Sequence, residues 1–148
     1  MTREEFRKLC VARWHDVVHV FPELGEKVVP IEFGHYEHFD SPRGFGVTFC
    51  EEIGECSMRY PPKLLAQHRT RIDGVLRHEL GHVVDHLLPP RRVNDRGRTR
   101  GLSRIAATPE RRADDVALLI WGTPLRYDEE LVQNTSVGVH PRPRHLGL

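Results

Sequence analysis

Two proline pairs set the strongest limit on how this chain of 148 residues can fold. Between Pro61-Pro62 and Pro89-Pro90, apolar residues recur every three or four positions from Arg71 to Leu88. This period predicts an amphipathic helix, and the second proline pair ends it because proline cannot continue a helix. The sequence therefore predicts one long helix that ends at the second proline pair.

A further helix is expected on each side of this one. Apolar residues at helical spacing run from Thr2, a candidate N-cap, to Phe21. A second capped helix is expected from Pro109 to Trp121, with Thr108 as its cap. Both begin with the residue types that satisfy the free N–H groups of a first helical turn.

Three short β-strands are expected at Val28–Phe33, Gly46–Glu51 and Glu55–Tyr60. The last two are separated by a turn-length gap that contains glycine, which predicts a hairpin with Cys50 opposite Cys56. Half-buried thiols, a cross-strand disulfide and a second metal site all stay open as interpretations of this cysteine pair. Helices and strands together predict an α+β fold.

The length suits one domain, which we place at residues 1–134, with residues 135–148 as a flexible or covering tail. Acidic residues near the start and the lack of a long apolar run predict a cytoplasmic protein with no membrane partner. The formal net charge of +1 does not identify any class of partner. The odd number of cysteines argues against a disulfide-rich secreted scaffold.

The central helix contains the run His78-Glu79-Leu80-Gly81-His82. Histidines four residues apart share one face of a helix, about 6 Å apart along the axis, so both rings can bind one zinc ion. Glu79 is too constrained to be an ordinary ligand but can reach a water on the metal, which suits a general base. Gly81 costs about 1 kcal/mol of helix propensity, which suggests that something approaches the helix closely there.

A catalytic zinc ion normally has three protein ligands. His86 follows on the same helix, but its distance of about 12 Å from His78 makes it a surface or supporting residue rather than a third ligand. Glu110, in the first turn of the last helix, is the better candidate, and Asp114 could accept a ring N–H from a ligating histidine. A dipole-stabilised acid and a solvated helix face remain the simpler interpretations of these two residues.

The motif, followed by Glu110-x-x-Ala113-Asp114-x-x-Ala117, resembles the gluzincin zinc peptidases, especially the minigluzincins and the ImmA/IrrE-type metallopeptidase domains. The resemblance extends from about Arg71 to Gly122. It implies a minimal zincin-like fold, with an N-terminal helix, a small twisted mixed sheet, an active-site helix and a glutamate helix.

The same resemblance implies a peptidase activity. One Zn²⁺ would be bound by His78, His82 and Glu110. A metal-activated water, with Glu79 as general base, would then hydrolyse peptide bonds of a peptide or protein substrate.

The chain departs from the ImmA/IrrE-type pattern at Asp114, where asparagine is usual, and no helix-turn-helix module accompanies the domain. Regulation by repressor cleavage is therefore not implied. The residue that stabilises the oxyanion stays open among Tyr127, His140 and His145.

Two alternatives to a peptidase stay open. The first is a catalytically silent or latent zinc-binding domain, with the tail or the loop Arg91–Thr108 gating the site. The second is a nucleic-acid-associated metalloprotein that uses the basic loop Arg91–Arg112. Because this loop lacks interleaved aromatic residues, we favour a solvated loop over a nucleic-acid surface.

Overall fold

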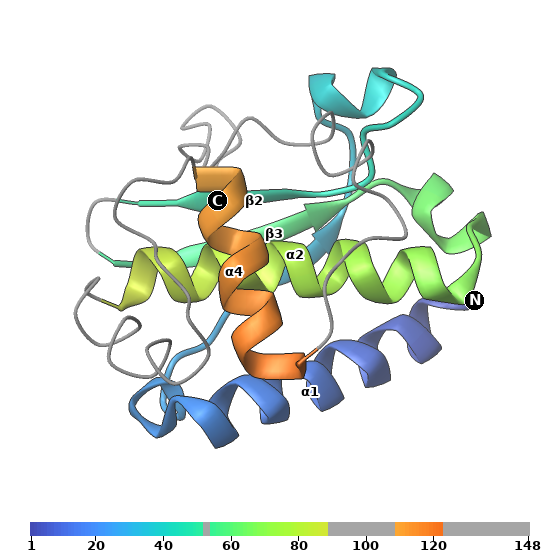
Figure 1. The fold of residues 1–148 in the computed structure, drawn as a ribbon. Helices are drawn as coiled ribbons and strands as arrows, with labels where there is room; N and C mark the ends of the chain where they lie inside the picture. Colours follow the sequence, from blue (N-terminus) through green and yellow to red (C-terminus); the bar gives the residue numbers. More distant parts are fainter. Residues whose placement is uncertain (52–53, 89–108, 123–148) are drawn as a thin grey trace.

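The computed structural model describes residues 1–51, 54–88 and 109–122, and within these ranges the protein has an α+β fold (Figure 1). Three α-helices accompany one small mixed sheet. The helices are α1 (Arg3–Val20), α2 (Arg69–Leu87) and α4 (Pro109–Trp121). The strands are β1 (Ile31–Phe33), β2 (Val47–Cys50) and β3 (Cys56–Tyr60). Short 3-10 helices occur at Pro22–Leu24, Glu37–Asp40 and Pro62–Ala66.

The sheet has the order β1-β3-β2. Strand β2 pairs with β3 in antiparallel fashion, and the register sets Cys50 opposite Cys56, which confirms the predicted hairpin. Strand β1 pairs with β3 in parallel. Within the described residues, β2 is therefore an edge strand with β3 as its only neighbour, and one face of it meets α2.

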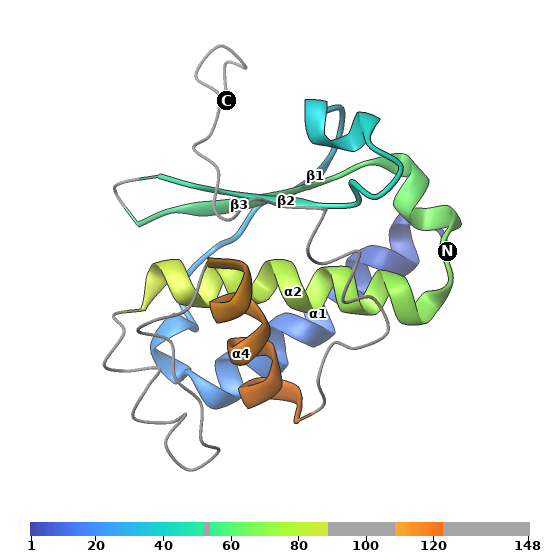
Figure 2. The ribbon, with the colours of Figure 1, turned by 45° about the horizontal axis from the view of Figure 1, so that its top comes forward.

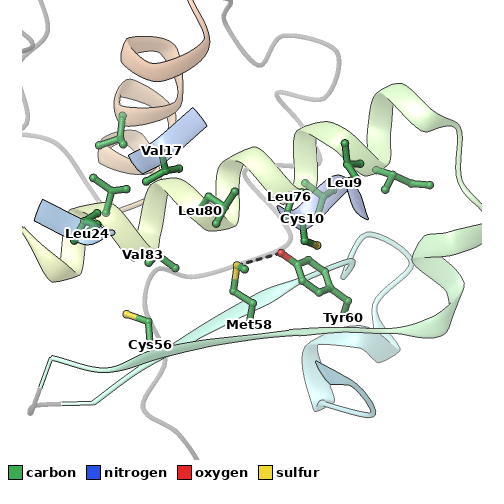
Figure 3. Close-up of a cluster of buried hydrophobic side chains, with 14 of the residues drawn as sticks. Leu9, Cys10, Val17, Leu24, Cys56, Met58, Tyr60, Leu76, Leu80 and Val83 are labelled. Carbon is green, nitrogen blue, oxygen red and sulfur yellow. Dashed lines mark hydrogen bonds between the residues drawn. The ribbon is translucent and has the colours of Figure 1, made fainter. Parts of the chain in front are cut away.

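The main hydrophobic core lies between the sheet and the helices α1 and α2 (Figures 2 and 3). Phe6 of α1 packs edge-on against Tyr60 of β3, with ring centroids 5.0 Å apart. Leu76 and Leu80 of α2 are fully buried, and Figure 3 shows them above Met58 and Tyr60 of the sheet. A smaller core on the opposite face of the sheet contains Phe39, Val47 and Phe49. Helix α2 is thus largely buried between the sheet and the other helices.

The ends of α1 follow the sequence signals. Thr2 accepts the N–H of Glu5, and the Glu5 carboxylate accepts the N–H of Thr2, which together form a capping box. Helix α2 begins two residues before the predicted Arg71, because the His68 side chain accepts the N–H of Thr70 at 3.2 Å and caps the first turn.

The predicted first strand, Val28–Phe33, was too long. The structure begins β1 at Ile31. Pro30 has no N–H to donate to the sheet, although its carbonyl accepts the N–H of Met58 at 2.9 Å. Val28 is 84% exposed and so lies on the surface rather than in the sheet.

Several predictions fall outside the described residues. These are the domain boundary at residue 134, the tail of residues 135–148, the loop Arg91–Thr108 and the oxyanion candidates Tyr127, His140 and His145. Among the helices that are described, none combines the length and apolar character needed to cross a bilayer.

Candidate metal centre

Helix α2 places His78 and His82 side by side in the interior. The two side chains are 1% and 0% exposed, and their ring centroids lie 4.7 Å apart. Glu110 reaches them from the first turn of α4. One ligand atom from each of these three residues lies within 4.8 Å of the other two. The described residues therefore include a three-ligand group that could hold a metal ion, from two helices that are 22 residues apart in sequence.

The Glu110 carboxylate faces both histidines. Its Oε2 lies 2.7 Å from Nε2 of His78, and its Oε1 lies 3.3 Å from Nε2 of His82. Within the ranges described, neither ring nitrogen of His82 has a hydrogen-bond partner of good geometry. A buried ring nitrogen without such a partner is costly in a protein that binds no metal, and a metal ion would satisfy it.

Asp114, one helical turn after Glu110, supports His78 from the other side. Its Oδ1 lies 2.8 Å from Nδ1 of His78. A carboxylate at this position holds the proton on Nδ1, so the lone pair of Nε2 is directed toward the metal position. This is the supporting contact that the sequence suggested for Asp114.

The close approach expected at Gly81 is made by the backbone of α4. A Cβ atom on Gly81 would lie 2.3 Å from the carbonyl oxygen of Ala113, far inside any permitted contact. Since Ala113 is one turn after Glu110, the missing side chain lets α4 bring its carboxylates to the histidines. Asp85 of α2 also binds Arg112 of α4, with Oδ2 3.1 Å from Nε. Asp85 is thus engaged in an ion pair between the two helices.

Glu79 lies beside the histidines and is 1% exposed. Its Oε2 accepts a short hydrogen bond from the Thr48 hydroxyl on β2, while Oε1 has no hydrogen-bond partner among the described residues. No signal in the sequence pointed to Thr48. The two residues are 31 positions apart, and no local pattern marks a lone threonine on a strand as the partner of a helical acid.

Burial and charge alter the titration of these groups. Burial raises the pKa of Glu79, and the two histidines and the Thr48 hydrogen bond only partly oppose this effect. Burial would lower the pKa of His78, but hydrogen bonds to Asp114 and Glu110 outweigh it and raise this pKa to about 10. Burial would raise the pKa of Glu110, but its interactions with His78 and His82 lower it to about 2. In the metal-free protein, these shifts favour a protonated His78, whose positive charge lies between the carboxylates of Glu110 and Asp114.

The donor set of two imidazole nitrogens and one carboxylate oxygen suits zinc and similar transition metals better than magnesium or calcium, which prefer oxygen ligands. Three protein ligands leave a coordination position open in a tetrahedral site. Glu79, which lies beside the histidines and whose pKa is raised by burial, is a candidate proton acceptor. The arrangement is chemically suited to hydrolysis as well as to binding.

Comparisons with known proteins do not identify a family. No family model matches the chain, and no curated protein or solved structure shows significant similarity to it.

Proposed function

We propose that this protein is a zinc-dependent peptidase with a minimal zincin-like fold of the gluzincin type. His78, His82 and Glu110 would hold one Zn²⁺, and Glu79 would be the general base. The single observation that supports this best is the convergence of three ligand atoms within 4.8 Å, from two helices, next to a buried acid.

Each residue has a separate task in this proposal. Bound zinc would supply Lewis acidity toward a scissile carbonyl and a water molecule. Glu79 accepts the proton of the attacking water and returns it to the leaving amine, for which its raised pKa suits it. Thr48 orients the Glu79 carboxylate through the hydrogen bond to Oε2. Asp114 fixes the ring of His78.

The arrangement of β2 supports a peptide as the substrate. Strand β2 is paired only with β3 among the described residues, and it contains Thr48, which contacts Glu79. All four residues of β2 are buried in this structure. An extended peptide that gained access to this edge would run past the general base, with backbone hydrogen bonds as its main source of affinity. This would select for an extended main chain rather than for one particular side chain.

The test is the Glu79→Gln substitution in the full-length, zinc-loaded protein. Because glutamine retains the shape but cannot accept the proton, cleavage of unfolded casein should fall by about 10²- to 10⁴-fold, with zinc content unchanged. Glu32→Gln provides the matched control. Glu32 pairs with Arg59 at 2.7 Å on the sheet, away from the histidines, so this variant should cleave at the parent rate.

Two outcomes would contradict the proposal. If Glu79→Gln cleaves casein as fast as the parent, the assignment of the base is wrong. If the parent retains one zinc ion at these ligands but cleaves nothing, before and after removal of residues 135–148, the site is a silent metal-binding domain.

A further inference from the structure

A second group of potential metal ligands lies at the other end of the contact between α2 and β2. It consists of Cys50 and Cys56 on the hairpin and His86 in the last turn of α2. Both sulfurs and one ring nitrogen of His86 lie within 4.8 Å of one another. None of these residues belongs to the site with His78, His82 and Glu110.

The two cysteines are brought together by the sheet. The N–H of Glu51 donates to the carbonyl of Glu55 at 2.8 Å, so the pair of residues 51 and 55 is a hydrogen-bonded one. Because such pairs alternate with non-hydrogen-bonded pairs, Cys50 and Cys56 form a non-hydrogen-bonded pair, whose side chains are the closer kind. Their sulfurs lie 2.6 Å apart, and both residues are buried.

Alternation along the strands directs both sulfurs toward α2. Cys56 shares its face of β3 with Met58 and Tyr60, and Figure 3 shows all three pointing toward the helix. Cys50 lies two residues after Thr48, whose hydroxyl meets α2 at Glu79. Since β2 continues along α2, the next inward side chain, Cys50, lies near the end of the helix, where His86 is located.

His86 is held in place by the backbone. Its Nε2 lies 3.0 Å from the carbonyl oxygen of Glu51, the residue after Cys50. Because a carbonyl only accepts hydrogen bonds, Nε2 carries the proton in this contact, and the other ring nitrogen keeps its lone pair. This arrangement is usual for a histidine that binds a metal.

A cavity adjoins one member of the group, Cys56. Its volume is about 310 Å³, and it is lined by Glu51, Glu55 and Leu87 among others. His86 is exposed to solvent, whereas the two sulfurs are covered. The cavity lining contains three glutamates and one lysine, Lys27, and this negative balance would attract a cation.

We propose that Cys50, Cys56 and His86 form a second metal site, which binds a thiophilic divalent cation of the zinc class and fastens the end of α2 to the β2–β3 hairpin. Two thiolates and an imidazole are ligands that zinc accepts and that magnesium and calcium avoid. Binding releases both thiol protons to solvent as the two metal–sulfur bonds form. Zinc–sulfur bonds of about 2.3 Å place sulfurs in a tetrahedral site about 3.8 Å apart, so the cysteine side chains rotate apart on binding.

The experiment is a Co²⁺ titration of the full-length protein, made metal-free and kept reduced without oxygen. Cobalt bound by thiolates absorbs in the near ultraviolet through sulfur-to-metal charge transfer, whereas cobalt at a site of two histidines and a glutamate does not. We expect the charge-transfer band to saturate at one equivalent of thiolate-bound cobalt per chain. The Glu110→Ala variant should keep this band, so the test does not depend on the proposed peptidase site.

Two variants and one control define the ligands. The double variant Cys50→Ser and Cys56→Ser should remove the band. The loss of a residue that only supports a ligand lowers metal affinity by about 10- to 100-fold. Because His86 would be a ligand itself, His86→Ala should weaken the cobalt affinity by more than this. Cys10→Ala removes the other buried thiol, which lies on α1, and should leave the band unchanged. Because His86 is exposed, its variant should fold even if the double cysteine variant does not.

Three results would overturn the proposal. The first is a reduced parent protein that binds cobalt without a charge-transfer band. The second is an unchanged affinity in His86→Ala. The third is a Cys50–Cys56 disulfide found by mass spectrometry in protein that was loaded with zinc and then exposed to air, since a bound metal would protect both thiols.

Discussion

The two ligand groups that include residues of α2 each orient a histidine by a hydrogen bond, but the acceptors differ in chemistry. At the first, His78 directs Nδ1 to the Asp114 carboxylate at 2.8 Å. At the second, His86 directs Nε2 to the carbonyl of Glu51 at 3.0 Å. In both, a hydrogen bond fixes the ring and leaves one nitrogen for a ligand. The acceptor is an anion in one case and a neutral backbone group in the other.

The surroundings of the two groups explain what each is suited to do. The first has an acidic ligand, a carboxylate behind one histidine and the buried Glu79 beside it, so proton transfer can occur there. In the second, thiolates would supply the charge. The hydrogen bond with Cys56 and burial raise the pKa of Cys50, which argues against a free reactive thiolate. We propose chemistry for the first group and, for the second, the joining of the end of α2 to the hairpin.

The largest expected difference comes from Glu110→Ala. The loss of a residue that only supports a ligand typically lowers metal affinity by about 10- to 100-fold. Removing the ligand Glu110 should lower the metal affinity of the histidine group by more than this. Casein cleavage should be lost with it. Zinc retention measured after dialysis against a chelator tests this, and the cysteine group serves as the internal reference because it lies outside α4. Full zinc retention at the histidines would remove Glu110 from the ligand set.

Asp114→Ala should have a smaller effect in the same direction. Without the carboxylate on Nδ1, the His78 ring loses its orientation, and zinc affinity should fall by about 10- to 100-fold. The neighbouring Asp115→Ala is the matched control, since no contact of Asp115 with either histidine is seen in the described part of the chain. Equal zinc affinities in the two variants would show that Asp114 is only a surface acid.

Gly81→Ala should separate the helices rather than remove a ligand. Although alanine favours helix, its Cβ would meet the Ala113 carbonyl, and overpacking of this kind costs about 1–3 kcal/mol of unfolding free energy. Denaturant unfolding of the metal-free protein measures the cost. Gly34→Ala is the control, because a Cβ there is 3.7 Å from the nearest atom of Arg59, an ordinary contact. A stabilised Gly81→Ala protein would mean that α4 does not pack as described.

The stability of the metal-free protein should also change with pH. The pKa of His78 is raised from 6.5 to about 10, so its stabilising contribution is complete below pH 6.5 and is lost as the pH rises through 10. The pKa of Glu110 is lowered from 4.5 to about 2, so its contribution is complete above pH 4.5 and is lost as the pH falls through 2.

Thermal unfolding in the presence of a chelator should therefore show the melting temperature of the parent falling between pH 6.5 and 10 relative to His78→Ala. Parallel profiles for the two proteins across that interval would contradict this assignment of the bound proton.

Local sequence patterns predicted most of the helical part of the fold. The capping box at Thr2, the apolar period of α2 and the start of α4 at Pro109 are signals within a few residues of one another. The hairpin register was also predictable, because a turn-length gap determines which residues pair. These features depend on backbone geometry over short distances.

Contacts between distant segments could not be predicted in the same way. The parallel pairing of β1 with β3 and the hydrogen bond from Thr48 to Glu79 join segments separated by about 27 and 31 residues. Any polar residue on a strand could have met the helix, so nothing in the sequence singled out Thr48. For the site, the motif placed His78 and His82 together, but only the packing of α4 brings Glu110 to them.

The close contact between Gly81 and Ala113 lies between two other contacts of α4. Glu110 lies one turn before Ala113. Trp121, whose indole donates to Asp16 of α1 at 2.8 Å, lies about two turns after it. Because a Cβ on Gly81 would already clash with the Ala113 backbone, the helices lie as close together at this point as their backbones allow. Helix α4 is therefore held at the histidines through Glu110, at α2 through the Gly81 contact and at α1 through Trp121.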